Sequence, residues 1–168
     1  MTPPLPASPR ERIVDLAEAA EFARDRQRRG LRVVFANGCF DVLHAGHVSY
    51  LNDARHEGDA LIVGINSDRS VREIKGPDRP IVPQEDRAEL IAAMEAVDRV
   101  VIFDEPTAER CLRTIRPDVH AKGTDYTAET VPEREIAREL GIRVAISGAP
   151  KTNASKQILR AVREQQTP

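Results

Sequence analysis

The chain has 168 residues, of which 40% are hydrophobic and 31% are charged. This balance is typical of a globular domain and excludes a disordered chain or a chain built of membrane spans. The formal net charge of -2 argues against a nucleic-acid coat protein, although a local basic pocket can lie within a weakly acidic protein. Folding at this length removes well over half of the unfolded chain's surface from water, so one domain with a substantial core is expected.

No signal for export is expected from the first residues of the sequence. Four prolines fall within the first ten residues, and no apolar run has the length of a signal peptide. No later stretch approaches about 18 consecutive apolar residues, so we expect a cytoplasmic protein with no membrane partner. Cys39 and Cys111 are far apart and form no CxxC pair, which indicates neither a disulfide framework nor a zinc cage. Both are expected to be packed small residues.

The first expected element is a helix. The segment 8–11, Ser-Pro-Arg-Glu, has the spacing of a capping box with proline at the first helical position, and an amphipathic run follows to Gly30. We therefore expect residues 1–30 to form a tail and a helix that pack on a core domain of residues 31–168.

Five strand-like segments follow in alternation with helices. Residues 31–36 are short, apolar and β-branched, as expected for a strand buried on both faces. Similar segments occur at 60–65, 99–103, 118–121 and 142–146, separated by helical patterns near 47–57, 83–97, 107–116, 132–140 and 154–164. Because parallel neighbours need crossover connections, this order predicts an α/β fold: a Rossmann-like open parallel sheet of about five strands with helices on both faces. Ligands of such sheets gather at the carboxyl ends of the strands, where the strand order reverses.

The loop after the first strand, from Asn37 to His47, holds two of the chain's four histidines. Gly38 permits a sharp turn after the strand, and Gly46 permits close approach of the backbone to a ligand. His44 and His47 stand three apart at an expected helix start, so both rings can point to one side, near the amide-rich helix end. This arrangement predicts a phosphate site. Zinc ligation is disfavoured because no third ligand stands at a recognisable spacing.

Cationic residues follow other expected strands. Lys75 and Arg79 come after the second strand, and Lys122 comes directly after the fourth. The ammonium of Lys122 can overhang the sheet edge and meet a phosphate, or it can be solvated beside a turn. Arg87 lies in a helical pattern, where a surface ion pair is the default.

Polar residues in two loops have two interpretations each. Asn66 and Asp68, after the second strand, fit a binding site or turn chemistry with a helix cap. Asp125 and Tyr126, after the fourth strand, fit a pocket wall or a plain turn with a packed ring.

The motif His-Ala-Gly-His at 44–47, within NGCFDVLHAGH, resembles the HxGH signature of the cytidylyltransferase-like nucleotidyltransferase superfamily. The likeness runs from about residue 31 to 159 and includes GINSD at 64–68, KGPDRP at 75–80, DRA at 86–88, EAVD at 95–98 and KGTDY at 122–126. The KGxDY element is similar to that of the sugar-phosphate branch, in particular the adenylyltransferase chain or domain of ADP-heptose synthesis. The adenylyltransferases of ADP-heptose synthesis join AMP to D-glycero-β-D-manno-heptose 1-phosphate. On this resemblance residues 31–168 form the nucleotidyltransferase domain.

The resemblance implies a direct transfer of AMP, in which an acceptor phosphate oxygen attacks the α-phosphorus of ATP and pyrophosphate leaves. The catalytic residues would be His44, His47 and Lys122, which stabilise negative charge on the phosphates. Nucleotide and phosphate would also be bound by Asn37, Gly38, Phe40, Asp41, Gly46, Lys75, Arg79 and Ser155. Weaker candidates for the acceptor or base pocket are Asn66, Asp68, Arg87, Asp125, Tyr126 and Lys156. Mg²⁺ would accompany ATP, held by the phosphates and water, with no assigned protein ligand.

Two positions depart from the family pattern. Relatives place adjacent serine or threonine hydroxyls before the last helix, where they bind nucleotide phosphate with the helix amides. This chain has Ser155 there but Ala154 beside it, and Lys156 either compensates by charge or faces solvent. His120 stands where relatives commonly carry an aliphatic residue, and we expect it to be buried and neutral.

Two other functions stay open. A CTP-dependent cytidylyltransferase acting on glycerol 3-phosphate or a phosphorylated amino alcohol shares HxGH, although KGTDY and the absence of tryptophan favour the first interpretation. A non-catalytic nucleotide-binding module would be expected to lack a motif histidine or Lys122, and neither is lost.

The resemblance also bears on partners. The expected partners are ATP and a small phosphorylated sugar rather than nucleic acid. Similar enzymes are usually homodimers. They are also often fused to a sugar kinase, for which these residues leave no room, so a separate kinase acting upstream is expected.

Overall fold

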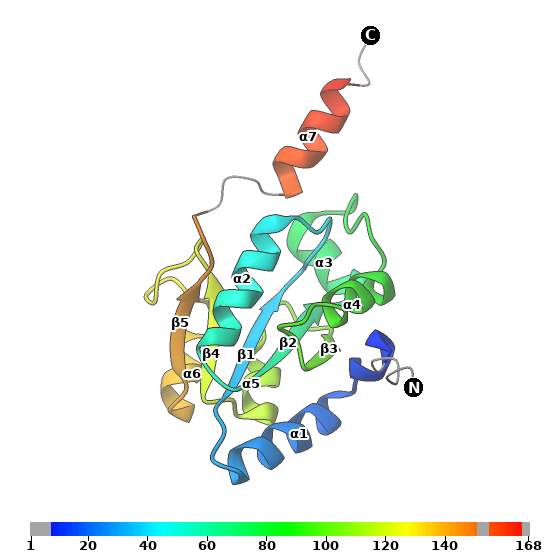
Figure 1. Ribbon diagram of the computed structural model, residues 1–168. Helices are drawn as coiled ribbons and strands as arrows, with labels where there is room; N and C mark the ends of the chain where they lie inside the picture. The colour runs from blue at the N-terminus through cyan, green and yellow to red at the C-terminus, as the bar shows by residue number, and fades with distance from the viewer. Residues whose placement is uncertain (1–7, 151–154, 166–168) are drawn as a thin grey trace.

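The computed structural model describes residues 8–150 and 155–165 (Figure 1). One sheet has the order β3-β2-β1-β4-β5, and all of its neighbouring strands are parallel. The strands are β1 (Val33–Gly38), β2 (Ala60–Asn66), β3 (Arg99–Phe103), β4 (Val119–Gly123) and β5 (Arg143–Ser147). The predicted Rossmann-like sheet is thus confirmed. Because β1 pairs with β2 on one side and β4 on the other, the strand order reverses at β1.

Helices cover both faces of the sheet. One layer contains α2 (Ala45–His56) and α4 (Gln84–Ala92), and the other contains α1 (Leu16–Arg28), α5 (Glu109–Ile115) and α6 (Arg134–Leu140). Alternate side chains of β1 divide between them, since Val34 joins the first core cluster and Phe35 the second. The last helix, α7 (Ser155–Gln165), buries none of its residues and extends away from the sheet (Figure 1).

The capping box predicted at Ser8 is wrong. The Ser8 side chain makes no capping hydrogen bond, and Pro9–Arg12 form only a short 3-10 turn, η1. The amide of Val14 then donates to a carbonyl of β3 (2.9 Å), so an extended segment interrupts the expected helix. The true capping box lies further on, where the Asp15 carboxylate accepts from the amide of Glu18 (2.8 Å) and the Glu18 carboxylate accepts from the amide of Asp15 (3.0 Å). The expected boundary at residue 30, between the N-terminal tail with its helix and the domain of residues 31–168, stays a prediction.

One helix was not expected from the sequence. The segment after β2 forms α3 (Asp68–Lys75), capped by the Ser67 hydroxyl, which accepts from the amide of Ser70. This helix is short and polar, and of its residues only Ser70 and Val71 are buried, so few apolar residues mark it in the sequence.

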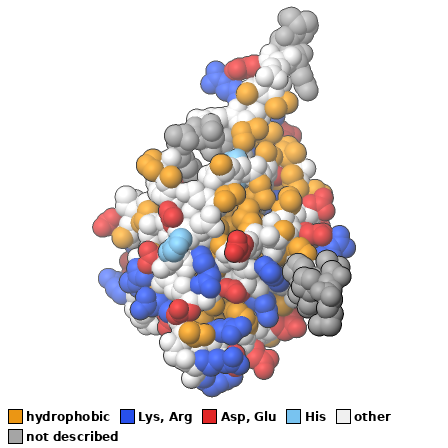
Figure 2. All heavy atoms as spheres, in the orientation of Figure 1, with side chains coloured by type: hydrophobic (Ala, Val, Ile, Leu, Met, Phe, Trp, Pro, Cys, Tyr) orange, Lys and Arg blue, Asp and Glu red, His pale blue; other side chains and the backbone are white. Residues whose placement is uncertain are grey.

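The surface seen in Figure 2 mixes charges of both signs over its lower part, while hydrophobic side chains gather towards the base of α7. The large hydrophobic residues exposed to solvent are Val48, Ile74, Ile81, Leu90, Ile146 and Val162. Within residues 8–150 and 155–165, no helix has the length and apolar character needed to cross a membrane.

Among the residues that the structure describes, Arg87 is the largest fully buried side chain, and it joins three segments at the carboxyl edge of the sheet. From α4 its guanidinium donates to the carbonyl oxygens of Val82 (2.9 Å), Cys39 and Asn66 (2.9 Å), and to the Asp68 carboxylate (2.7 Å). The expected surface ion pair is therefore wrong. Arg87 instead fixes the loop after β1, the end of β2 and the start of α3 relative to one another.

Replacing Arg87 by methionine keeps much of the side-chain volume but leaves these buried acceptors without donors. We expect Arg87→Met to lower the free energy of unfolding by about 3–5 kcal/mol and Tm by roughly 6–20 °C. The control is Arg69→Met, which removes an exposed ion pair with Asp104 and should change Tm little. Equal thermal melting of the two variants would contradict the structural role of Arg87.

Candidate active site

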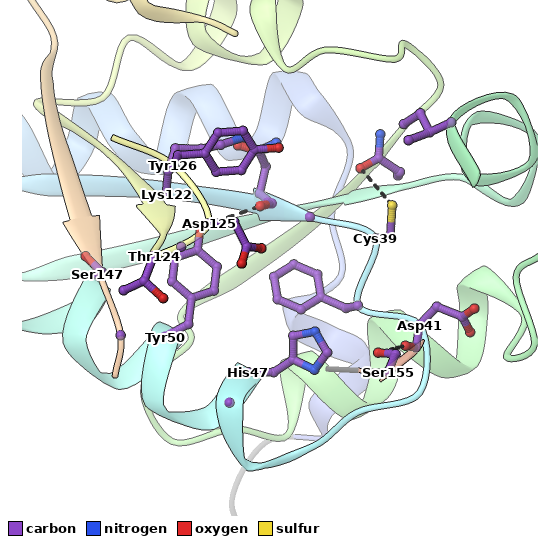
Figure 3. A pocket seen from close by; sticks show the side chains of 18 of the residues that line it. Cys39, Asp41, His47, Tyr50, Lys122, Thr124, Asp125, Tyr126, Ser147 and Ser155 are labelled. Carbon is purple, nitrogen blue, oxygen red and sulfur yellow. Dashed lines mark hydrogen bonds between the residues drawn. The ribbon is translucent and has the colours of Figure 1, made fainter. Parts of the chain in front are cut away.

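A cavity of about 370 Å³ opens at the carboxyl ends of the strands, between the loops that follow β1 and β4 (Figure 3). This is the point where the strand order reverses, as expected for a ligand site in an open parallel sheet. Most of the residues predicted from the sequence line it: Asn37, Gly38, Phe40, Asp41, Gly46, His47, Asn66, Lys75, Lys122, Asp125, Tyr126 and Ser155.

Other predicted residues do not line the cavity: His44, Asp68, Arg79, Arg87 and Lys156. Asp68 and Arg87 bind each other, and Arg79 binds the Asp41 carboxylate. His44 lies beside the cavity as the N-cap of α2, while Lys156 is exposed on α7. Ala154, the departure noted beside Ser155, lies outside the described residues.

The two motif histidines are held in a chain of hydrogen bonds at the start of α2. Nδ1 of His44 accepts from the amide of Gly46 (3.1 Å), and Nδ1 of His47 accepts from the amide of His44 (3.3 Å). Because Nδ1 is an acceptor in both rings, each ring carries its hydrogen on Nε2. The ring centroids are 4.0 Å apart. His47 therefore brings an N–H donor to the cavity wall, and His44 positions the backbone and the ring of His47.

The loop between β1 and α2 is strained and is held in place by Asp41. Phe40 (φ 50) and Val42 (φ 59) adopt the left-handed conformation, which costs non-glycine residues about 1–3 kcal/mol each. Between them the buried Asp41 carboxylate accepts hydrogen bonds from Arg79 and from the backbone amides of residues 81–82. Burial alone would raise the pKa of Asp41, but these donors outweigh it and the pKa is lowered. The carboxylate thus stays ionised and ties the loop to the segment before α4.

Ser155 connects α7 to the same loop. Its hydroxyl donates to the carbonyl oxygens of Asp41 (2.7 Å) and Val42 (3.2 Å) while the residue lines the cavity. The side chain therefore anchors the helix start beside the proposed phosphate position.

Lys122 is buried, so the alternative of a solvated lysine is wrong. Its side chain is 7% exposed, its Nζ lies 3.4 Å from Oε2 of Glu133, and it stands 4.7 Å from the centre of the Tyr126 ring. Burial favours a raised pKa for Glu133, but the charge of Lys122 and a hydrogen bond from the amide of Ala108 (3.0 Å) lower it overall. The Glu133 carboxylate is therefore ionised beside the Lys122 side chain in the cavity wall.

Sequence reasoning did not single out Glu133. It lies eleven residues after Lys122, at the expected start of a helix, where a glutamate is ordinary. Only the packing of α6 (Arg134–Leu140) against α5 and the sheet places its carboxylate in the cavity wall.

His120 confirms the expectation of a buried, neutral histidine. Its Nε2 lies 2.8 Å from Oδ1 of Asn37, and burial lowers its pKa to about 4. The contact joins β4 to the end of β1, so it holds the amide side chain of Asn37 at the cavity wall.

Cys39 and Tyr50 are among the other residues that line the cavity without having been predicted there. Cys39 was expected to be a packed small residue, yet its Sγ lies at the wall, 3.9 Å from Oδ1 of Asn66. Burial raises the pKa of Cys39, which disfavours a thiolate nucleophile. Tyr50 donates its hydroxyl to the carbonyl of Ala121 (2.8 Å), and burial raises its pKa as well.

The described residues do not fit a dedicated metal centre. Among residues 8–150 and 155–165, no group of three or more His, Cys, Asp or Glu side chains could hold an ion. The cavity's buried carboxylates, Asp41 and Glu133, are already bound to Arg79 and Lys122.

Comparison with known proteins agrees with this geometry. The family model described as cytidylyltransferase-like matches residues 35–161. A crystal structure titled as the lipopolysaccharide core biosynthesis protein from Thermoplasma volcanium is 32% identical, with a TM-score of 0.61, over 74% of this chain and 100% of that one.

Curated relatives named bifunctional protein HldE match most of the chain. The protein from Nitratiruptor sp. is 49% identical over 84% of the chain, and the one from Campylobacter fetus is 50% identical over 78%. The chain spans only 31% and 29% of their respective lengths. With the family match covering the sheet and its cavity, the chain belongs to the cytidylyltransferase-like family of nucleotidyltransferases.

Proposed function

We propose that the chain transfers AMP from ATP to D-glycero-β-D-manno-heptose 1-phosphate, giving ADP-heptose and pyrophosphate. The observation that carries the proposal is the meeting of the HxGH and KGTDY segments at one cavity, where His47 and Lys122 both form part of the wall. The resemblance of KGTDY to the sugar-phosphate branch supports the acceptor. The names of the relatives and the lipopolysaccharide title of the structural neighbour support it further.

The residues suit a reaction that needs positioning and charge stabilisation rather than a covalent nucleophile. An oxygen of the acceptor phosphate attacks the α-phosphorus, the bond to the bridging oxygen breaks, and its electrons leave with pyrophosphate. The Nε2–H of His47, the amides at the start of α2 and the Lys122 ammonium would stabilise the negative charge on the phosphates. Asn37 and Lys75 would bind other phosphate oxygens from the wall.

Magnesium would enter with the triphosphate rather than occupy a protein cage. Its preferred ligands are phosphate oxygens and water, with few protein carboxylates. This agrees with the engagement of Asp41 and Glu133 by cationic side chains. The acceptor is a sugar 1-phosphate, which a sugar kinase acting upstream would supply.

The function is tested by pyrophosphate release with Mg²⁺, using ATP and CTP each against heptose 1-phosphate and glycerol 3-phosphate. We expect release only with ATP and the heptose phosphate. Release only with CTP and glycerol 3-phosphate would replace the proposal by a cytidylyltransferase. Binding of ATP without release in any combination would favour a non-catalytic module or an untested acceptor.

The role of His47 is tested by His47→Ala. Loss of one preorganised donor to the developing charge is expected to reduce kcat by about 10²–10³-fold, while Tm changes little because the ring is only partly buried. The control is His56→Ala at the other end of α2, where the side chain is exposed. A kcat for His47→Ala close to that of the control would remove the catalytic role.

A further inference from the structure

The Glu133 carboxylate has one oxygen that is bound and one that is not. Oε1 accepts from the amide of Ala108 at the start of α5 (3.0 Å). Oε2 is buried and makes no hydrogen bond to any residue that the structure describes, and its charge partner is Lys122 at 3.4 Å. The side chain is 2% exposed and lines the cavity beside Thr107 and Pro132. A buried carboxylate oxygen without a hydrogen-bond donor is unfavourable, so a donor from a bound molecule would stabilise it.

The charges around Oε2 select the kind of group that can bind there. A phosphate oxygen would be repelled by the carboxylate. An ammonium group would add a second positive charge next to Lys122, which already balances Glu133. A hydroxyl group is neutral, donates one hydrogen, and forms a strong bond to an ionised acceptor. The corner at Glu133 therefore suits a hydroxyl, and the wall around His47 suits phosphate.

We propose that Oε2 of Glu133 accepts a hydrogen bond from a hydroxyl group of the acceptor sugar, making Glu133 a specificity-determining residue. This inference rests on the proposed function, because it requires a sugar phosphate as acceptor. The Lys122 ammonium next to Glu133 would contact the acceptor's phosphate. The sugar would then be held at two points whose separation is fixed by the Lys122–Glu133 pair.

The first test is Glu133→Gln, measured as KM for the sugar 1-phosphate and for ATP. Glutamine keeps the shape and retains an oxygen for the Ala108 amide, but it replaces Oε2 by an uncharged NH₂ group. We expect KM for the sugar phosphate to rise about 10–100-fold, as for loss of a hydrogen bond to a charged group, with KM for ATP within about twofold. Glu133→Asp, which keeps the charge but withdraws the oxygen, should also raise KM for the sugar phosphate.

The second test uses sugar 1-phosphates that each lack one hydroxyl. With the wild-type protein, kcat/KM for one of these analogues should be about 10-fold or more below kcat/KM for the parent sugar 1-phosphate. With Glu133→Gln, the same analogue and the parent sugar 1-phosphate should have equal kcat/KM. The matched control is Glu135→Gln on the same helix, since Glu135 is exposed and pairs with Arg138 at the surface. It should behave as wild type with every acceptor.

Several results would overturn the inference. A wild-type KM for the sugar phosphate in Glu133→Gln would do so, as would an equal response of wild type and variant to every missing hydroxyl. A parallel loss of Tm, ATP binding and acceptor binding would show a structural role only. If the wild-type protein uses no sugar 1-phosphate, the proposed function itself fails, and this inference fails with it.

Discussion

The site depends on the contacts of the Asp41 carboxylate. Phe40 and Val42, on either side of it, adopt a backbone conformation that neither side chain favours. The loop keeps this shape because Arg79 and two backbone amides converge on the carboxylate, and because Ser155 binds the loop's carbonyl oxygens from the other side. With the loop fixed, the helix start that carries His44 and His47 is fixed as well. Arg79, which the sequence suggested as a phosphate ligand, holds the loop through its ion pair with Asp41.

The topology of the sheet brings the other parts of the site together. Because β1 lies between β2 and β4, the HxGH loop faces the KGTDY loop although about 75 residues separate them in the sequence. Because β1 and β4 are parallel, the loops that follow them lie at the same edge of the sheet. The Lys122–Glu133 pair then places a positive and a negative group side by side in one wall of the cavity.

Features that depend on local sequence could be predicted. The strands were found because apolar β-branched runs identify buried parallel strands, and the loop after β1 was found because two glycines and two histidines stand at helix-start spacing. Features that depend on contacts between residues distant in sequence could not be predicted. Arg87 looked like a surface residue because its partners, the carbonyl oxygens of Cys39 and Asn66, are distant in sequence. Glu133 has no local signature, and the helix expected at Ser8 is displaced by pairing of Val14 with β3.

The central claim is that nucleotide phosphates and the acceptor phosphate meet between His47 and Lys122 at the junction of β1 and β4. The most direct measurement is a crystal structure of the protein with a non-hydrolysable ATP analogue, Mg²⁺ and heptose 1-phosphate. We expect the triphosphate at the start of α2 within hydrogen-bond distance of Nε2 of His47, and the acceptor phosphate on the Lys122 side. A nucleotide bound away from this cavity, with His47 and Lys122 contacting neither ligand, would contradict it.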